Sequence, residues 1–336
     1  MSTTTVGKDA QWSFCGDRTP ASGVVLATAW IWLDHDVEGR ALWTPPATHE
    51  VVSGNRVISY CLYGPSDGFP VIAHGGSPST RWRRTDVIES IERCAVRVLA
   101  FDRPGYPGST RQVGRRICDI AHDVELLADA NGWRQFAVFG YSGGGPYALA
   151  CAAVLADRVS RCAVGAAVAP PDADGVDFFG RRDARRGKAF RLALVGEAEL
   201  RPYLAHVAEA VMVGVEAGGP EMLPEPHTPR RGEQPTAQPP RALEDAAAMA
   251  RLKATFVDSH DGWVDDQIAV AHPWGFDPRT ITTPVGVWHG RHDVRIPEDH
   301  TSWLVANIPN AQRYDHDGGH LPSDRVYRDM FTWLSR

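Results

Sequence analysis

The sequence predicts an α/β fold: a mostly parallel sheet of the doubly covered type, with helices on both faces and an inserted helical cap. Short apolar runs alternate with stretches of helical periodicity along residues 45–170 and again along 278–336, which is the pattern of strand–helix–strand units. The runs are continuously apolar, as is typical of parallel strands buried on both faces. Residues 171–277 contain helical stretches and no clear strand. We therefore divide the chain into an N-terminal arm (1–44), a core (45–170 and 278–336) and a cap (171–277).

The composition is that of a globular protein without obvious affinity for nucleic acid or membranes. The chain has 336 residues, of which 43% are hydrophobic, which is enough for one core and a smaller inserted domain. Its net charge of −6 argues against a general nucleic-acid binder. The six cysteines form no C-x-x-C pair, which favours free thiols in a reducing compartment. No apolar run reaches the ~18 residues of a membrane span, and residues 23–33 lack the basic flank of a secretion signal, so we expect a cytoplasmic protein.

The elements of the core follow from apolar runs and turn signals. In chain order, the strands that we expect are 49–53, 56–63, 70–73, 96–101, 136–139, 159–168, 284–290 and 312–314. The helices that we expect are the segment ending at Ile91, 117–130, 146–154, 297–306 and the last segment up to Trp333. Gly54-Asn55 between the first two strands is a hairpin signal. Asn131-Gly132 closes the helix over 117–130 as a C-cap.

The cap and the arm carry weaker signals. Helices are expected over 190–213 and 242–256, joined by the proline-rich polar stretch 221–240, which is typical of a flexible loop. A basic run spans 181–191, and we interpret it as a solvated helix face, with steering of an anionic substrate as the alternative. The arm shows no catalytic pattern, and we expect its apolar stretch 29–33 to pack on the body.

A G-x-S-x-G motif, residues 140–144 with Ser142 at its centre, follows the strand 136–139 and precedes a helix. Strand, motif and helix together are the context of a nucleophilic serine on a tight strand-to-helix turn. Such a turn forces the serine into a strained backbone conformation, and close approach of the chain to itself requires glycine two residues before and after. The alternative interpretation is a glycine-rich helix N-terminus capped by Ser142.

An acid and a base follow later in the chain. Asp293 lies in the loop after the strand 284–290, and His320 lies in the loop before the last helix, at the end of the sheet where ligands gather in parallel folds. The order serine, acid, histidine is that of one lineage of catalytic triads. Taken singly, Asp293 could be a turn former and His320 a packing residue. Asp172 or Asp174 is the alternative acid.

Glycines also follow the strand 70–73. His74-Gly75-Gly76 is a turn in which the missing side chains allow backbone N–H groups to approach an oxygen atom closely. The segment from Asp102 to Gly105 is expected to close a tight turn beside the site. His289 and His292 flank the acid, where a helper role has no support in the sequence. No H-E-x-x-H or other metal-ligand spacing is present.

Together these motifs resemble those of the α/β-hydrolase-fold superfamily, in particular its capped, esterase-like bacterial serine hydrolases. The matching pieces are His74-Gly75-Gly76, Asp102-Arg103-Pro104-Gly105-Tyr106, Gly140-Tyr141-Ser142-Gly143-Gly144, His289-Gly290-Arg291-His292-Asp293 and Gly319-His320. They extend from about residue 49 to the C-terminus, interrupted by the cap, and residues 265–277 resemble a bacterial subgroup. One departure is Ser77, which stands where many members have proline. The resemblance therefore leaves the position of the N–H donor in this loop undetermined by one residue.

The resemblance implies acyl transfer. His320 would take the proton of Ser142, and Asp293 would orient the imidazole and stabilise its charged form. The backbone N–H groups of Gly143 and Gly76 would hold the oxyanion. No metal and no organic cofactor is implied.

We therefore expect a serine hydrolase that cleaves an ester-type bond of a small or medium apolar substrate. Candidate pocket residues are Tyr141, Trp263, Trp274 and Phe276, with packing between cap and core as the alternative role of the last three. A proline-releasing aminopeptidase, a carbon–carbon bond hydrolase or a cofactor-free perhydrolase would use the same triad, and a non-catalytic ligand sensor is an alternative of another class. The expected partner is a small-molecule substrate, without nucleic acid or stable membrane insertion, and a homodimer is the assembly to test.

Overall fold

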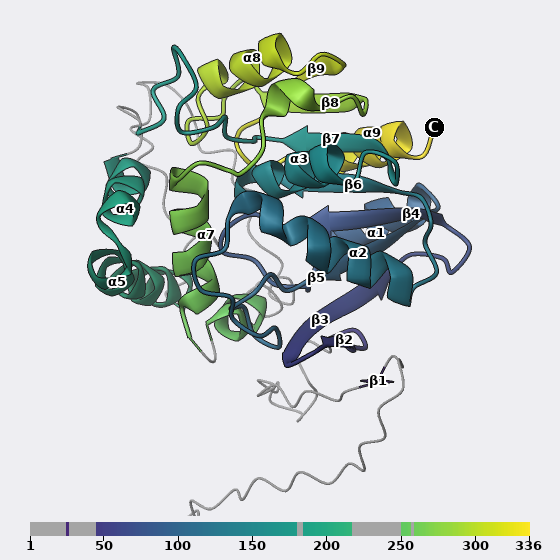
Figure 1. Ribbon diagram of the computed structural model, residues 1–336, viewed down its shortest axis with the longest axis horizontal. Coiled ribbons are helices and arrows are strands. Elements are labelled where there is room, and N and C mark those ends of the chain that lie inside the picture. The colour runs from purple at the N-terminus through teal and green to yellow at the C-terminus, as the bar shows by residue number, and fades with distance from the viewer. Residues whose placement is uncertain (1–24, 27–44, 180–183, 217–249, 257–258) are drawn as a thin grey trace, which may run out of the picture.

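A computed structural model describes residues 25–26, 45–179, 184–216, 250–256 and 259–336. In this part of the chain, the strands form a single sheet in the order β1-β2-β3-β5-β4-β6-β7-β8-β9. The pairs between β5 and β9 are all parallel, and β1, β2 and β3 pair in antiparallel fashion at one edge. The mostly parallel α/β fold predicted from the sequence is confirmed (Figure 1).

The elements alternate along the chain as the pattern predicts. The strands are β1 (Val25–Leu26), β2 (His49–Ser53), β3 (Arg56–Tyr63), β4 (Phe69–His74), β5 (Val96–Phe101), β6 (Phe136–Tyr141), β7 (Val159–Gly165), β8 (Val285–Gly290) and β9 (Ala311–His316). The α-helices are α1 (Thr85–Arg93), α2 (Ile120–Ala130), α3 (Gly145–Val154), α4 (Ala184–Val195), α5 (Glu197–Glu216), α7 (Asp261–Ala271), α8 (Glu298–Asn307) and α9 (Asp324–Leu334). Short 3₁₀ turns are η1 (Ile117–Asp119), η2 (Ser142–Gly144) and η3 (Pro278–Thr280).

Two of the differences between predicted and observed elements have a clear cause in the backbone. The strand expected over 159–168 ends at Gly165, because Ala166 turns into the left-handed region with a φ of 47°. The helix expected over 190–213 is two helices, because Gly196 adopts a φ of 136° between α4 and α5. A continuous helix cannot contain that angle, which glycine adopts most readily.

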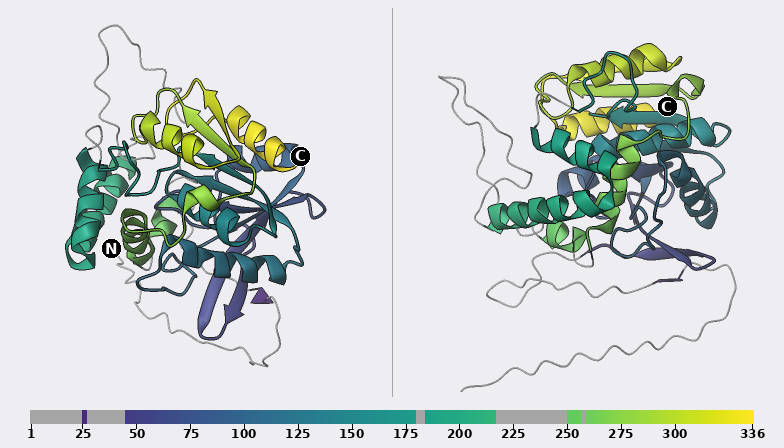
Figure 2. Two further views of the ribbon diagram at one scale, coloured as in Figure 1. Left: turned by 45° about the horizontal axis from the view of Figure 1, so that its top comes forward. Right: turned by 60° about the vertical axis from the view of Figure 1, so that its left-hand side comes forward.

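Helices cover both faces of the sheet. α1 and α9 pack against each other on one face, while α2 and α3 pack together on the other, with α3 also against β6 and β7 (Figures 1 and 2). The strands between them are largely apolar, and all six residues of β6 and of β8 are buried. This burial on both sides explains why the runs in the sequence are continuously apolar.

A helical insertion, the segment between β7 and β8, contains α4, α5 and α7. These three helices pack on one another and lie together on the side toward which β6 and β7 point (Figure 1). Residues 250–255 are also helical, within the stretch predicted as 242–256, whereas α7 was not predicted. The division into arm, core and cap stays a prediction. The predicted packing of 29–33, the loop 221–240 and the first part of the basic run fall outside the described residues.

The strand register brings four loops to one end of the sheet. His74 at the end of β4 pairs with Gly140 near the end of β6, and Gly290 at the end of β8 pairs with His316 at the end of β9. In parallel strands the carboxyl ends share one edge, where ligands bind. The loops that carry the serine motif, the glycine turn, the acid and the histidine therefore converge.

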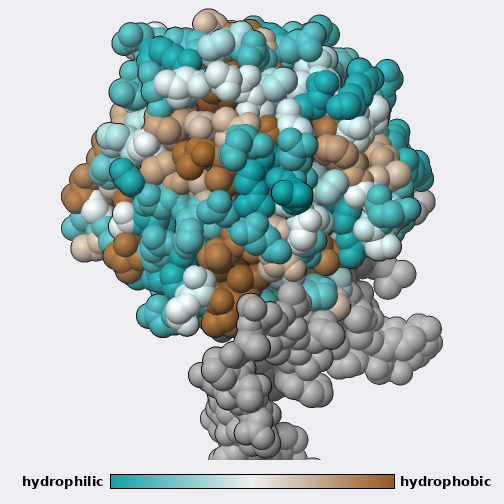
Figure 3. Space-filling view, turned by 45° about the vertical axis from the view of Figure 1, so that its right-hand side comes forward, coloured by the Kyte–Doolittle hydropathy of each residue, from teal (hydrophilic) through white to brown (hydrophobic). Residues whose placement is uncertain are grey.

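Among the described helices, none is long and apolar enough to cross a membrane. On the face shown in Figure 3, hydrophobic residues lie in separate groups among hydrophilic ones, as is ordinary for protein surfaces. The cysteines within the described ranges are free thiols, and Cys61, Cys151 and Cys162 are buried.

Candidate active site

Ser142 lies on the sharp turn that joins β6 to α3. Its φ is 51°, in the left-handed region that non-glycine residues rarely adopt, at a cost of about 1–2 kcal/mol. The preceding residue is still extended, with φ −129° and ψ 134°, and the 3₁₀ turn η2 starts at the serine itself. The strained turn expected from the G-x-S-x-G motif is present.

The two glycines of the motif are required by close contacts of the backbone. A Cβ atom on Gly140 would lie 2.7 Å from the carbonyl oxygen of Gly144 and from Cβ of Ala148. A Cβ atom on Gly144 would lie 2.2 Å from the carbonyl oxygen of His74. Real Cβ atoms do not approach backbone atoms this closely, so any side chain at either position would force the turn open.

A chain of hydrogen bonds links the serine, the histidine and the acid. The distance from His320 Nε2 to Ser142 Oγ is 3.1 Å, and that from His320 Nδ1 to Asp293 Oδ2 is 3.0 Å. All three residues are buried. A carboxylate can only accept, so Nδ1 carries the proton and Nε2 is left to accept from the serine hydroxyl. This tautomer is the one that a general base needs.

Asp293 is held as a carboxylate. Its other oxygen, Oδ1, accepts backbone N–H bonds from Arg295 at 2.8 Å and Ile296 at 3.0 Å. Burial alone would raise the pKa of Asp293, but the hydrogen bond and charge of His320 and the two backbone N–H groups outweigh it and lower the pKa below its ordinary value. The acid therefore stays ionised at neutral pH.

The competing candidates from the sequence lie elsewhere. Asp172 and Asp174 are exposed, whereas the carboxylate beside His320 is that of Asp293. His289 Nδ1 lies 3.2 Å from the hydroxyl of Thr301. His292 is exposed and contacts Asp317. A helper role for either histidine gains no support from these contacts.

The glycine turn after β4 lies directly against the serine. A Cβ atom on Gly76 would be 3.5 Å from Cβ of Ser142 and 4.0 Å from its Oγ. The next residue, Ser77, faces Gly143: a Cβ atom on Gly143 would lie 3.2 Å from the backbone nitrogen of Ser77. The turn is thus in contact with both the serine and the residue that follows it.

His74 lies beneath this turn and is not part of the hydrogen-bonded chain. It is buried between Phe101 and Tyr147, with ring centroids 5.3 Å and 6.4 Å away. Burial, together with the charges of Arg103 and Arg83, lowers the pKa of His74 to about 3. It is therefore a neutral packing residue.

An ionic cluster that the sequence did not indicate lies behind the turn. Its centre is Asp266 of α7, which is completely buried. The carboxylate accepts hydrogen bonds from Arg103 (2.5 Å), Arg115 (2.5 Å), Ser77 (2.5 Å), Tyr106 (2.9 Å) and Tyr147 (2.8 Å). Burial would raise the pKa of Asp266, yet the charges of the two arginines hold it well below its usual range.

This low pKa predicts a specific pH dependence of stability. Above about pH 5 the carboxylate is ionised in both folded and unfolded chains, and its full contribution is present. As the pH falls through the ordinary carboxyl value, the unfolded chain binds the proton first, so stability is lost. We expect Asp266→Asn to lower the free energy of unfolding by about 3 kcal/mol at pH 7, and this difference to shrink below pH 4 in urea titrations.

The neighbouring Asp265 is the control for this experiment. It lies next to Asp266 on α7 but pairs with the half-buried Arg111, at 2.8 Å and 2.9 Å. We expect Asp265→Asn to cost less than Asp266→Asn at pH 7. If the difference in free energy of unfolding between wild type and Asp266→Asn stays constant down to pH 3, the low pKa assigned to Asp266 is wrong.

The aromatic pocket candidates contact other parts of the protein. Trp274 and Phe276 stack on each other at 5.8 Å, and Trp274 Nε1 donates to the carbonyl of Val270. Trp263 packs on Phe256 at 5.6 Å. These side-chain contacts lie within the insertion, and the backbone carbonyl of Trp274 also accepts a bond from the N–H of Cys118 in the core. Lining of the pocket by these three residues stays a prediction, as does their packing between cap and core.

Tyr141, the fourth pocket candidate, contacts the histidine of the hydrogen-bonded chain. Its ring meets that of His320 edge-on, with centroids 5.7 Å apart. It is buried, and burial raises the pKa of its hydroxyl well above the ordinary value. Tyr141 is therefore a neutral neighbour of the histidine.

In the basic run, Lys188 and Arg191 are exposed. Lys188 Nζ lies 4.7 Å from the ring centroid of Tyr203, and Arg191 donates to the carbonyl of Phe179. This agrees with a solvated helix face. Across the described ranges, no group of three or more His, Cys, Asp or Glu side chains is arranged to hold a metal ion.

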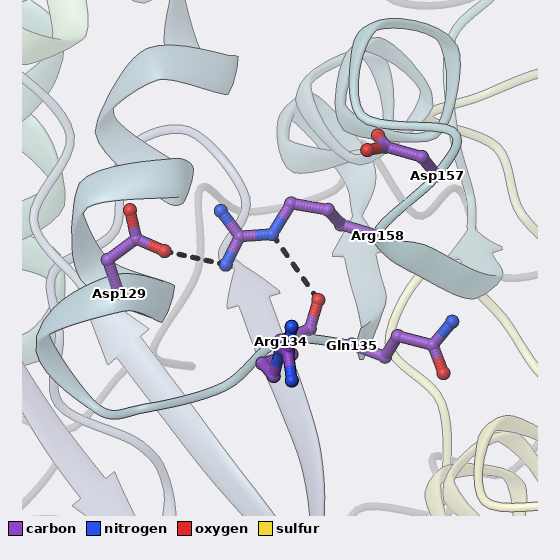
Figure 4. A pocket seen from close by; sticks show the side chains of 5 residues that line it. All are labelled: Asp129, Arg134, Gln135, Asp157 and Arg158. Carbon is purple, nitrogen blue, oxygen red and sulfur yellow. Dashed lines mark hydrogen bonds and ion pairs between the residues drawn. The ribbon is translucent and has the colours of Figure 1, made fainter.

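A surface hollow at the opposite end of β6 is a different kind of site. It is lined by Asp129, Arg134, Gln135, Asp157 and Arg158 (Figure 4). Arg158 reaches across it to Asp129 at 2.7 Å and to the carbonyls of Trp133 and Arg134. These bonds join the residue before β7 to the end of α2 and to the segment before β6, so we assign the hollow a structural role.

Comparison with protein families identifies the class. The family model described as alpha/beta hydrolase fold matches residues 70–324. The chain therefore belongs to the α/β-hydrolase fold family, as the motifs had indicated, and this membership supports hydrolytic activity in general. No curated protein sequence matches the chain.

Solved structures share the fold at low sequence identity. A hydrolase from Pseudomonas aeruginosa PA01 has a TM-score of 0.57 and 19% identity, over 85% of this chain and 96% of that one. A thermophilic esterase from Thermogutta terrifontis has a TM-score of 0.57 and 20% identity, over 85% of this chain and 97% of that one. An enol-lactonase from Burkholderia xenovorans LB400 has a TM-score of 0.57 and 19% identity, over 84% of this chain and 96% of that one. At such identities the likeness shows the fold alone.

Proposed function

We propose that the protein is a serine hydrolase that cleaves an ester-type bond of a small or medium apolar substrate. The observation that supports this most is the hydrogen-bonded chain from Ser142 through His320 to Asp293, with distances of 3.1 Å and 3.0 Å. A strained serine in contact with an unprotonated imidazole nitrogen, at the carboxyl end of a parallel sheet, is the arrangement of an activated nucleophile.

The reaction runs in two halves. Ser142 Oγ attacks the carbonyl carbon while His320 Nε2 takes its proton, and Asp293 stabilises the imidazolium that forms. The backbone N–H groups of Gly143 and Gly76 stabilise the oxyanion. His320 then returns the proton to the leaving alcohol, which leaves an acyl group on the serine. Water, deprotonated by His320, attacks this ester and releases the acid.

A proline aminopeptidase must bind the free ammonium group of its substrate, a role for which a carboxylate close to the serine is suited. Two described carboxylates are already engaged: Asp293 is hydrogen-bonded to His320 and two N–H groups, and Asp266 is bonded to two arginines. Neither of these two is available for an ammonium group, and we therefore place the ester first. The esterase and the enol-lactonase among the structural neighbours are compatible with this proposal.

A substrate panel tests the proposal. We expect p-nitrophenyl esters of acetate, butyrate and octanoate to be hydrolysed, with the preferred acyl length reporting the depth of the pocket, and proline p-nitroanilide to be left intact. Turnover of the anilide, of a 1,3-diketone, or of acetate and peroxide to peracid in preference to the esters would identify one of the alternative hydrolases. A folded protein that turns over none of these and is not labelled by a fluorophosphonate would be a ligand sensor. Cytoplasmic location, independence from cofactors and a homodimer stay predictions.

A further inference from the structure

Arg103 forms hydrogen bonds to the backbone of the glycine turn, residues 74–76. Its Nη1 donates to the carbonyl oxygen of Gly75 at 2.7 Å and its Nη2 to that of Gly76 at 2.8 Å. A peptide unit is planar and trans, so its N–H points opposite to its C=O. Because Arg103 binds these two carbonyls, the N–H groups of Gly76 and Ser77 point away from Arg103. The side of Gly76 that lacks a Cβ atom faces Ser142.

The carboxylate of Asp266 fixes the guanidinium in this position. It bonds Nε of Arg103 at 3.1 Å and Nη2 at 2.5 Å, which is the bidentate arrangement of a planar fork. It also accepts from Ser77 Oγ at 2.5 Å, so that it holds the turn directly as well as through the arginine. Arg103 and Asp266 are 2% and 0% exposed, so water does not compete for these bonds.

Asp266 belongs to the insertion, whereas the turn and Arg103 belong to the sheet. α7 is seated on the loop of Arg103 by a backbone bond from the N–H of Gly262 to the carbonyl of Gly105, at 2.9 Å. Gly105 has a φ of 89°, and a Cβ atom there would lie 2.8 Å from the nitrogen of Gly262. The insertion and the glycine turn are thus joined through backbone and ionic contacts together.

We propose that Arg103, held by Asp266, is a positioning residue that sets the direction of the oxyanion-binding N–H groups, so that the hole is formed only when α7 is seated on the core. This inference rests on the proposed hydrolase function. It does not depend on whether Gly76 or Ser77 is the donor, because Arg103 orients both peptide units. The two residues touch no reacting atom and act through the turn.

The cluster contains its own control, because two arginines bond one carboxylate. Arg115 bonds Asp266 at 2.5 Å and Tyr147, and like Arg103 it is buried. No contact given by the structure within the described residues joins Arg115 to Gly75 or Gly76. Arg103→Gln and Arg115→Gln each leave Asp266 paired with the other arginine, so neither variant strands a buried charge.

We expect Arg103→Gln to lower kcat on a p-nitrophenyl ester by about 100-fold, as the loss of an oxyanion donor does, with KM changed less than about threefold. Arg115→Gln should lose comparable thermal stability and keep kcat within about threefold. A trifluoromethyl ketone, whose adduct with the serine carries an oxyanion, should bind Arg103→Gln weaker by the same factor as kcat falls. Fluorophosphonate titration of active serines corrects every rate for the folded fraction.

Arg103→Lys covers the case in which the glutamine variant does not fold. It keeps the positive charge beside Asp266, but a single ammonium cannot hold both carbonyls in the plane of a fork, so we expect about a tenfold loss of kcat. Equal losses in Arg103→Gln and Arg115→Gln, or full kcat in either Arg103 variant, would overturn the positioning role while leaving the hydrolase intact. A wild-type protein with no ester turnover and no labelling would instead overturn the proposed function and this inference with it.

Discussion

Ser142→Ala is expected to lower kcat for ester hydrolysis by about 10⁶-fold, as removal of a triad serine does elsewhere, and to abolish labelling by a fluorophosphonate. In the proposed mechanism the Ser142 hydroxyl forms the acyl intermediate, so its removal stops the reaction. Alanine at a φ of 51° is as strained as serine, so the variant should fold with a melting temperature close to that of the wild type. Stopped assays on an ester, together with gel detection of the probe, measure both effects.

Ser160→Ala is the matched control. This serine lies on β7, where its hydroxyl donates to the carbonyl of Phe136 at 3.3 Å, at the opposite end of the sheet from Ser142. The control variant should keep full activity and full labelling. Labelling of Ser142→Ala at the wild-type rate would show that the probe reacts at another residue, and Ser142 would then not be the nucleophile.

The strained turn at Ser142 was predictable because its causes are local in the sequence. An apolar strand, two glycines around a serine and an apolar helix specify one conformation, and the clashes that a Cβ atom would meet at Gly140 and Gly144 explain why these positions are glycine. The convergence of Asp293 and His320 on Ser142 was predictable for a related reason. Each follows a recognisable parallel strand, and such strands end at a common edge.

The ionic cluster was not predictable, because it joins residues far apart in the chain. Arg103 and Asp266 are separated by 163 positions, and the first had been assigned only to a turn. The helix that carries the second was missed, since an Asp-Asp pair interrupts its apolar spacing. Both aspartates are buried, and Asp266 has five side-chain partners. Two adjacent carboxylates within an apolar helix are the signal that could have indicated it.

The pocket is the part of the site on which sequence reasoning had least to build. Aromatic residues in an insertion either line a cavity or pack on the core, and both roles bury them. Trp274 illustrates this, because its backbone carbonyl accepts a bond from Cys118 and its ring stacks on Phe276. The composition of a segment cannot separate these roles, whereas contacts can.

His320→Ala is expected to lower kcat by about 10⁵- to 10⁶-fold with little change in KM, because no other described base lies at hydrogen-bond distance from Ser142 Oγ. The critical control is the double variant with Asp293→Asn. Asparagine alone should cost about 10⁴-fold, since it favours the wrong imidazole tautomer, but Asp293 acts only through the histidine. In the His320→Ala background it should therefore change kcat by less than about threefold. Independent, multiplying losses in the double variant, or more than a hundredth of wild-type kcat in His320→Ala, would mean that the proton of Ser142 leaves by another route.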